Sequence, residues 1–188
     1  ALHHHLGCSA FADHAVVSRR SLVKIDQDLP FQEAALFGCA VLTGVGAVVN
    51  TGRVQAGESV AVIGLGGVGL AAVLGAIACG ASQIIAVDVS DEKLALATSM
   101  GATATVNARD PDAIEQVRQL TGGGADFVFE FAGVGAALEN AYKMTKRGGT
   151  TVTAGLPPPD VNLALNIVSL VAEERTVKGS YIGTCVPV

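Results

Sequence analysis

The feature that most constrains this chain is a glycine-rich turn, GLGGVG, set between two apolar segments. Residues 59–63 before it are short, apolar and mostly β-branched, which is typical of a strand buried on both faces of a parallel sheet. Residues 70–78 after it consist only of Ala, Leu, Val, Ile and Gly and predict a buried helix. Residues 83–87 predict a second buried strand, which ends at Asp88. The order of these segments predicts a nucleotide-binding βαβ unit.

The spacing of the motif explains the choice of glycine. Gly64 allows the sharp turn, Gly66 leaves no Cβ where a pyrophosphate would touch the backbone, and Gly69 lets the helix lie close to the strand. The helix N-terminus supplies unpaired N–H groups and a positive dipole end for a diphosphate. Asp88 follows about 20 residues later, where a carboxylate can accept from both hydroxyls of an adenosine ribose. The alternatives are another nucleotide-like ligand, such as an adenosyl-methionine cofactor, or a plain glycine-rich turn.

Asp88 also bears on the choice of cofactor. A carboxylate at that strand tip repels a 2′-phosphate, and the following Val89 and Ser90 offer no cation to receive one. The sequence therefore favours NAD over NADP.

The rest of the chain alternates helices and strands. Six strands with intervening helices are expected between residues 59 and 182, which is the number in a complete doubly wound parallel sheet of the Rossmann type. Near the N-terminus, the apolar runs 15–17 and 22–23 predict a β ribbon. Residues 31–50 predict two helices that meet at a kink near Gly38 and Cys39, the second of them packed closely through glycine and alanine.

Composition excludes several classes of protein. The chain has 188 residues, half of them hydrophobic, with a net charge of −5 and no basic run, so nucleic acid is not an expected partner. No apolar run is uninterrupted enough for a membrane span; residues 59–78 come closest, and their glycines fit a strand and helix instead. No signal peptide is recognised, and the four cysteines are widely spaced without a CxxC motif. A reducing, cytoplasmic location is therefore expected.

At this point the chain resembles a known family, the zinc-dependent medium-chain alcohol dehydrogenases. The match runs from Gly38 to Asn107 and continues through DFVFEFAG, TVTAGLPPP and TVKGSYIG. The most similar branch includes the glutathione-dependent formaldehyde dehydrogenases and the animal liver alcohol dehydrogenases. The resemblance implies that residues 41–188 form the NAD-binding domain and that residues 1–40 are a β and helical remnant of a GroES-like catalytic domain with its connecting helix.

The resemblance also implies roles for individual residues. Cys39 matches a protein ligand of the catalytic zinc, and Thr43 matches a residue against the nicotinamide face. Lys93 matches a second contact to the ribose beside Asp88. The pyrophosphate loop is matched by Gly64, Gly66, Gly67, Val68 and Gly69, and the wall near the adenosine-side ribose and the pyrophosphate by Phe131 and Ala132. The loop around the nicotinamide is matched by Ala154, Gly155 and Leu156, and the backbone partners of its carboxamide by Ser180 and Ile182.

The family pattern is incomplete in this sequence. A cysteine and a histidine that complete the zinc site, a four-cysteine structural zinc lobe and a C-terminal return are not found, so the chain is expected to be a fragment. Because a catalytic zinc usually has three protein ligands, no tightly held zinc is expected. His14 is expected to be an ordinary strand residue, and the run His3, His4 and His5 a tag remnant rather than a metal site. Residues 178–188 match the strand that pairs in family dimers, so a homo-oligomer is expected.

Three functions remain open at this stage. The first is the cofactor half of an NAD-dependent alcohol dehydrogenase acting on a small alcohol or aldehyde, inactive alone. The second is a dinucleotide-binding module without catalysis. The third, a zinc-free quinone or enoyl reductase, is less favoured because Cys39 stands at the ligand position and because such relatives usually prefer NADP over NAD.

Overall fold

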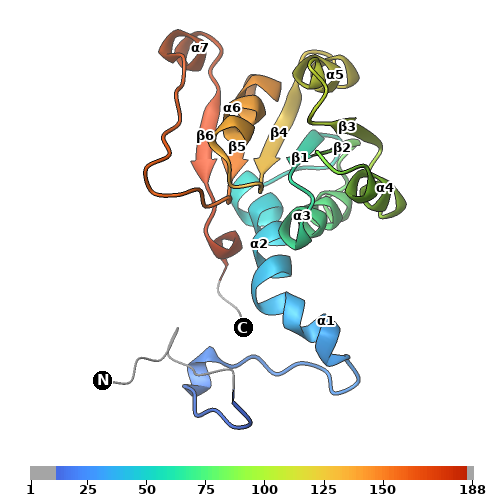
Figure 1. Cartoon of the computed structure of the whole chain (residues 1–188), viewed down its shortest axis with the longest axis vertical. Coiled ribbons are helices and arrows are strands. Elements are labelled where there is room, and N and C mark those ends of the chain that lie inside the picture. Colours follow the sequence, from blue (N-terminus) through green and yellow to red (C-terminus); the bar gives the residue numbers. More distant parts are fainter. Residues whose placement is uncertain (1–11, 186–188) are drawn as a thin grey trace.

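The computed structural model describes residues 12–185 and contains one sheet of six parallel strands (Figure 1). The spatial order of the strands is β3-β2-β1-β4-β5-β6, the order of a doubly wound dinucleotide fold. The expected fold class is therefore confirmed. The strands are β1 (Ser59–Ile63), β2 (Gln83–Asp88), β3 (Ala104–Asn107), β4 (Ala125–Glu130), β5 (Thr145–Thr153) and β6 (Thr176–Gly179).

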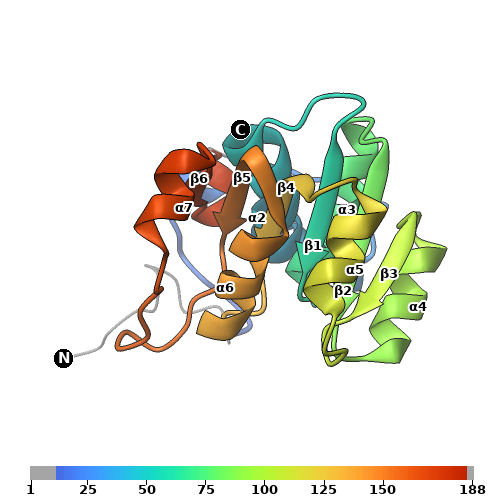
Figure 2. The same ribbon diagram turned by 90° about the horizontal axis from the view of Figure 1, so that it is seen from above.

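Helices cover both faces of this sheet (Figure 2). One face packs against α3 and α4 through a core that includes Ala72, Val73 and Leu94. The other face packs against α5 and α6 through Val117 and Met144. The helices are α3 (Gly67–Ala78), α4 (Asp91–Ser99), α5 (Ala113–Leu120), α6 (Gly135–Met144) and α7 (Ile167–Ala172).

The central strand β1 shows why a continuous apolar run becomes a strand here. All five of its residues are buried. Val60 and Val62 belong to the core on one face, while Ala61 and Ile63 belong to the core on the other. Successive side chains point to opposite faces of a sheet, so a strand covered on both sides must be apolar at every position.

Residues 31–52 form one continuous helical rod rather than two helices separated by a break (Figure 1). It consists of α1 (Phe31–Leu36), a π-helical turn η3 (Phe37–Val41), α2 (Leu42–Gly46) and a second π-helical turn η4 (Ala47–Gly52). The first π-helical turn contains the position of the predicted kink. An extra residue per turn, typical of a π bulge, replaces the expected break.

The second half of the rod packs closely, as predicted from its glycines. A Cβ added to Gly44 would lie 2.8 Å from Ala71 Cβ and from Ala72 N in α3. A Cβ added to Gly75 would lie 3.2 Å from Val45 Cα. Glycine on both helices therefore lets the two backbones approach each other.

The same rod is, by length and composition, able to cross a membrane, which differs from the sequence expectation. It has 22 residues with a mean hydropathy of 1.7, and 22% of its most apolar window is buried. This is weak evidence for a membrane, because core helices of other proteins meet the same criterion. Residues 59–78, the expected nearest candidate, form β1, the glycine-rich turn and α3 instead.

The predicted N-terminal β ribbon is wrong for the described residues. Residues 12–30 contain a single 3₁₀ turn, η2 (Arg19–Ser21), and no strand. Val16, placed in the ribbon, is 99% exposed. A two-stranded ribbon is marginal by itself, and no strand of the described chain pairs with residues 15–17 or 22–23. The predictions for the three consecutive histidines and for residues 186–188 lie outside the described residues.

Candidate functional site

The loops that carry most of the predicted cofactor residues lie at the carboxyl edge of the sheet, where the strand order reverses between β1 and β4. Here β1 continues into the glycine-rich loop, and β4 continues into the segment 131–133. The N–H of Phe131 donates to the carbonyl of Ile63 at 2.8 Å, so the two loops start side by side. In doubly wound sheets, ligands bind at this switch point.

The glycine-rich loop has the geometry that its three glycines predict. Gly64 has a φ of +88°, and an added Cβ would lie 2.7 Å from Ala132 N. A Cβ on Gly69 would overlap the carbonyl oxygen of Gly64. A Cβ on Gly66, in contrast, would meet nothing within 4 Å. Gly66 thus faces open space at the N-terminus of α3.

The N-terminus of α3 carries no side-chain cap. Gly66 occupies the N-cap position, and Gly67 and Val68 follow it as the first helical residues. The first amide groups of a helix have no intrahelical acceptor, so those of α3 point toward the open space beside Gly66. Such an arrangement is suited to an anion.

Asp88 lies at the tip of β2 and is joined to the same loop. Its Oδ2 accepts from the N–H of Leu65 at 2.7 Å, and its Oδ1 accepts from the N–H of Ser90 at 3.0 Å. The Nζ of Lys93 lies 3.9 Å from Oδ2. A carboxylate has about four acceptor positions, so two are not used by these hydrogen bonds, and the side chain is 6% exposed.

The loops after β4 and β5 meet through Glu130, a residue that the sequence analysis missed. Glu130 is 1% exposed and accepts from the N–H of Gly133 and from the Thr153 hydroxyl, both at 2.7 Å. Its carboxylate thus lies beneath the predicted residues of these loops: Phe131, Ala132, Ala154, Gly155 and Leu156. An acid between phenylalanines in FVFEF was the available signal.

The segment after β6 packs against the helical rod. The N–H of Ser180 donates to Thr153 O at 2.8 Å, and the Ser180 hydroxyl lies 2.9 Å from the hydroxyl of Thr51. Ile182 adopts a φ of 48°, which is uncommon for a β-branched residue. Thr43 is buried on the same rod, in α2. Thr51 is a further polar residue of this cluster, which the sequence analysis missed.

Cys39 is separate from any metal-ligating cluster in the described part of the chain. It is exposed on η3, and no group of three His, Cys, Asp or Glu side chains gathers within residues 12–185. His14 is exposed in the N-terminal segment. Because a catalytic zinc needs about three protein ligands, the described residues do not fit a closed zinc site.

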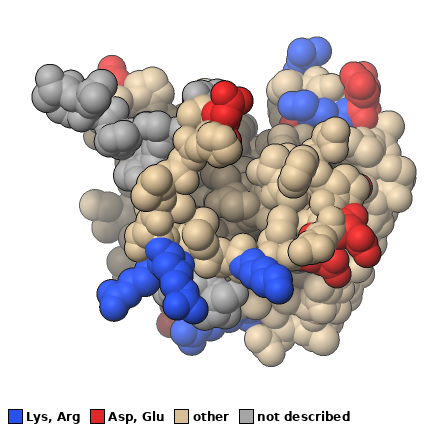
Figure 3. Space-filling view, turned by 90° about the horizontal axis from the view of Figure 1, so that it is seen from below, with Lys and Arg blue, Asp and Glu red and all other residues tan. Residues whose placement is uncertain are grey.

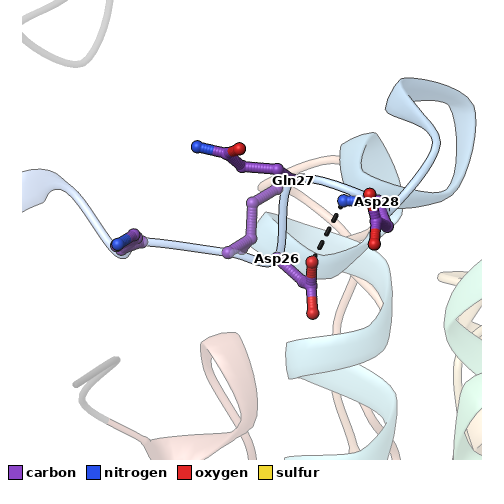
Figure 4. Close-up of a pocket in the computed structure, with 5 residues that line it drawn as sticks. Asp26, Gln27 and Asp28 are labelled. Atoms are coloured by element: carbon purple, nitrogen blue, oxygen red, sulfur yellow. Dashed lines mark hydrogen bonds between the residues drawn. The ribbon is translucent and has the colours of Figure 1, made fainter.

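Two hollows lie away from the carboxyl edge. One is lined only by residues 24–28, where the N–H of Asp28 donates to Asp26 Oδ1 at 3.0 Å (Figure 4). The other, of about 890 Å³, lies between the N-terminal segment and the helical rod and is largely apolar. Figure 3 shows this end of the molecule hollowed, with few charged side chains at its centre. Neither hollow contains the residues predicted for the cofactor.

The sheet, its strand order and the central glycine-rich loop define a doubly wound α/β domain of the Rossmann class. A family model described as zinc-binding dehydrogenase matches residues 67–187. The chain therefore belongs to the zinc-binding dehydrogenase family.

Solved structures agree with this assignment. An alcohol dehydrogenase zinc-binding domain protein from Burkholderia ambifaria is 34% identical, with a TM-score of 0.92 over 96% of this chain and 49% of its own. Benzyl alcohol dehydrogenase from Acinetobacter calcoaceticus is 32% identical, with a TM-score of 0.91 over 96% of this chain and 50% of its own. Alcohol dehydrogenase TADH from Thermus sp. ATN1 is 31% identical, with a TM-score of 0.79 over 86% and 46%. The chain spans about half the length of these relatives.

Proposed function

We propose that this chain is the NAD-binding half of a zinc-dependent alcohol dehydrogenase that acts on a small alcohol or aldehyde. The observation that carries the proposal is the joining of Asp88 to the glycine-rich loop beside the open position at Gly66. A carboxylate and a set of free helix amides, fixed to each other by a hydrogen bond, match the ribose and the pyrophosphate of a dinucleotide.

Different residues at the carboxyl edge would bind different parts of the cofactor. Asp88 and Lys93 would hold the adenosine ribose, and the loop 64–69 would hold the pyrophosphate. The loops 131–133 and 154–156 would flank the cofactor on the β4 and β5 side. Thr43, Ser180 and Ile182 would orient the nicotinamide. The acid at residue 88 disfavours a 2′-phosphate, which supports NAD rather than NADP.

The type of reaction that we propose, hydride transfer, is inferred from the chemistry of NAD and from the alcohol dehydrogenases to which the chain is similar. NAD, when bound, would accept a hydride from the carbinol carbon of an alcohol or return it to an aldehyde. The contribution of this chain would be to bind the dinucleotide and to fix the orientation of its two halves. Cys39 is the only residue at an expected zinc-ligand position in the described part of the chain, so the described residues support no step through zinc.

Titration with NADH and with NADPH tests the proposal. We expect saturable NADH binding, seen as a change in nicotinamide fluorescence, and much weaker NADPH binding. Equal affinity for the two would contradict the role of Asp88. Failure of both to bind would contradict dinucleotide binding by this chain.

We also propose self-association through the β6 edge, in a cytoplasmic setting. In the described chain β6 pairs only with β5, so one side of the strand is free to pair. On the neighbouring helix α7, Ile167, Val168 and Val171 are 74%, 74% and 71% exposed, which favours burial against a second copy. A mass measurement by light scattering that gives only monomer would contradict the association.

The proposed cytoplasmic setting rests on a separate observation. Cys39, Cys79 and Cys185 are free thiols, which supports a reducing compartment.

A further inference from the structure

Glu130 is a buried acid at the end of the central strand β4. Its residue is 1% exposed, and within residues 12–185 it forms no ion pair. Burying a carboxylate without a cation has a large free-energy cost unless hydrogen bonds compensate for it. Such a group therefore needs a reason beyond packing.

Four hydrogen bonds connect Glu130 to its surroundings, three of them to the two loops and one to Thr153 at the end of β5. Its side-chain oxygens accept from the N–H of Gly133 and from the Thr153 hydroxyl, each at 2.7 Å. Its carbonyl oxygen accepts from the N–H groups of Ala154 at 3.0 Å and Gly155 at 3.3 Å. One residue of β4 thus holds both its own loop and the loop after β5.

The two loops are also in direct contact. A Cβ added to Gly155 would lie 2.5 Å from Gly133 N and 2.7 Å from Glu130 Oε2. A small displacement of the carboxylate would therefore move both loops together. The side chain of Asp88 is held by neither of these two loops, because it accepts its hydrogen bonds from Leu65 and Ser90.

We propose that Glu130 is a positioning residue for the nicotinamide half of the cofactor. The inference rests on the proposed function, since it names what holds two loops of that site in place. The two side-chain oxygens of Glu130 accept from an N–H and a hydroxyl at once, so both bonds depend on this one group. Loss of either bond loosens the loop 154–156, assigned to the nicotinamide, and the end of the loop 131–133 at Gly133. Phe131 on the adenosine side keeps its hydrogen bond to Ile63, and Asp88 keeps its own hydrogen bonds.

The test compares a whole dinucleotide with its adenosine half. NADH and AMP are titrated by calorimetry against wild-type chain and the variants Glu130→Gln, Thr153→Val and Thr153→Ser. The glutamine variant offers one acceptor oxygen in place of two, and valine removes the hydroxyl at position 153, whereas serine keeps it. We expect the first two variants to bind NADH about tenfold more weakly, with AMP affinity within about twofold of wild type, and Thr153→Ser to bind like wild type.

The outcomes separate this inference from the function on which it rests. Wild-type chain that binds neither NADH nor AMP overturns both. Wild-type binding with unchanged NADH affinity in Glu130→Gln and Thr153→Val overturns the positioning role alone. A parallel loss of AMP and NADH affinity with a lowered unfolding temperature also overturns it, because it indicates a merely structural role. If Glu130→Gln does not fold, the valine and serine variants at Thr153 decide the question.

Discussion

The carboxylate of Asp88 and the backbone N–H of Leu65 are 2.7 Å apart, so the acid at the tip of β2 is bonded to the loop that follows β1. This hydrogen bond joins the two parts of the candidate site into one unit. A hydrogen bond to a charged acceptor contributes about 1.5–3 kcal/mol. The acid therefore fixes the loop, and under the proposed function it would also discriminate between NAD and NADP.

Replacement of Asp88 by asparagine should weaken NADH binding and reduce the preference over NADPH. The amide cannot accept from Leu65 and Ser90 as a carboxylate does, and it no longer repels a 2′-phosphate. We expect NADH affinity to fall about tenfold or more, while NADPH affinity changes less. Fluorescence titration with both nucleotides measures the ratio. The matched control is Asp91→Asn, an acid that contacts Asn107; a similar loss in that variant would count against the special role of Asp88.

Two glycines of the same motif should behave in opposite ways. Gly66 has open space around its missing Cβ and a negative φ of −77°, so Gly66→Ala should fold normally and lose NADH affinity where the pyrophosphate needs the space. Gly69→Ala forces a methyl group onto Gly64 O and should lower the free energy of unfolding by about 1–3 kcal/mol. Urea unfolding and NADH titration of both variants provide the measurement. Tight NADH binding by Gly66→Ala would argue against a pyrophosphate at this position.

At the opposite edge of the sheet, Asp126 should make the stability of the fold sensitive to acid. Burial raises the pKa of its carboxyl group, but hydrogen bonds from Lys146 and Ser59 outweigh that effect, and the pKa lies below its ordinary value of 3.8. Oδ2 accepts from the N–H of Ser59 at 2.9 Å and from its hydroxyl at 2.6 Å. A lowered pKa in the folded state means that the stabilisation is present above the unfolded value and is lost as the pH falls through the folded one.

Asp126→Asn should therefore lower the free energy of unfolding near pH 7 by about 1–3 kcal/mol. Below about pH 4 the unfolded wild-type chain begins to bind a proton at Asp126, so the difference between the two proteins should shrink until the pH has passed the lower pKa of the folded state. Urea unfolding from about pH 7 down to about pH 3 follows this. Lys146→Met should have a smaller effect, about 1 kcal/mol or less, because the lysine side chain is 46% exposed. A difference that stays constant over the pH range would contradict the assignment.

Most of the fold could be predicted because buried parallel strands are continuous apolar runs. Residues 59–63 and 83–87, expected as strands, lie in β1 and β2. The glycine-rich loop could be predicted equally well, since the spacing of its glycines reflects local backbone geometry. Strand β5 begins at Thr145 and has an irregular register opposite Ala125. That irregularity depends on the neighbouring strand, which a local pattern does not contain.

The incorrect and missed predictions also have their cause in contacts between segments that are distant in the sequence. The runs 15–17 and 22–23 have strand composition, but nothing in the described structure pairs with them, and composition does not supply a partner. Glu130 was missed because its importance depends on Thr153 and Gly133, which reach it only through the folding of β5 and the loop after β4. Local patterns predict elements, whereas the contacts between elements decide which polar residues matter.

The helical rod offers a last test, in which the same substitution should have opposite effects at two positions. A Cβ added to Gly38 meets nothing within 4 Å, whereas one added to Gly46 would lie 2.6 Å from Gly183 Cα in the turn η5 (Ile182–Thr184). Gly38→Ala should raise the free energy of unfolding by about 0.5–1 kcal/mol, because alanine loses less backbone entropy in a helix. Gly46→Ala should lower it by about 1–3 kcal/mol, because the rod and the turn must separate. Since Ile182 belongs to that turn and Ser180 precedes it, Gly46→Ala should also weaken NADH binding, while Gly38→Ala should leave it unchanged. Thermal unfolding and NADH titration of the pair check both effects, and a destabilised Gly38→Ala would show that η3 makes contacts other than those described.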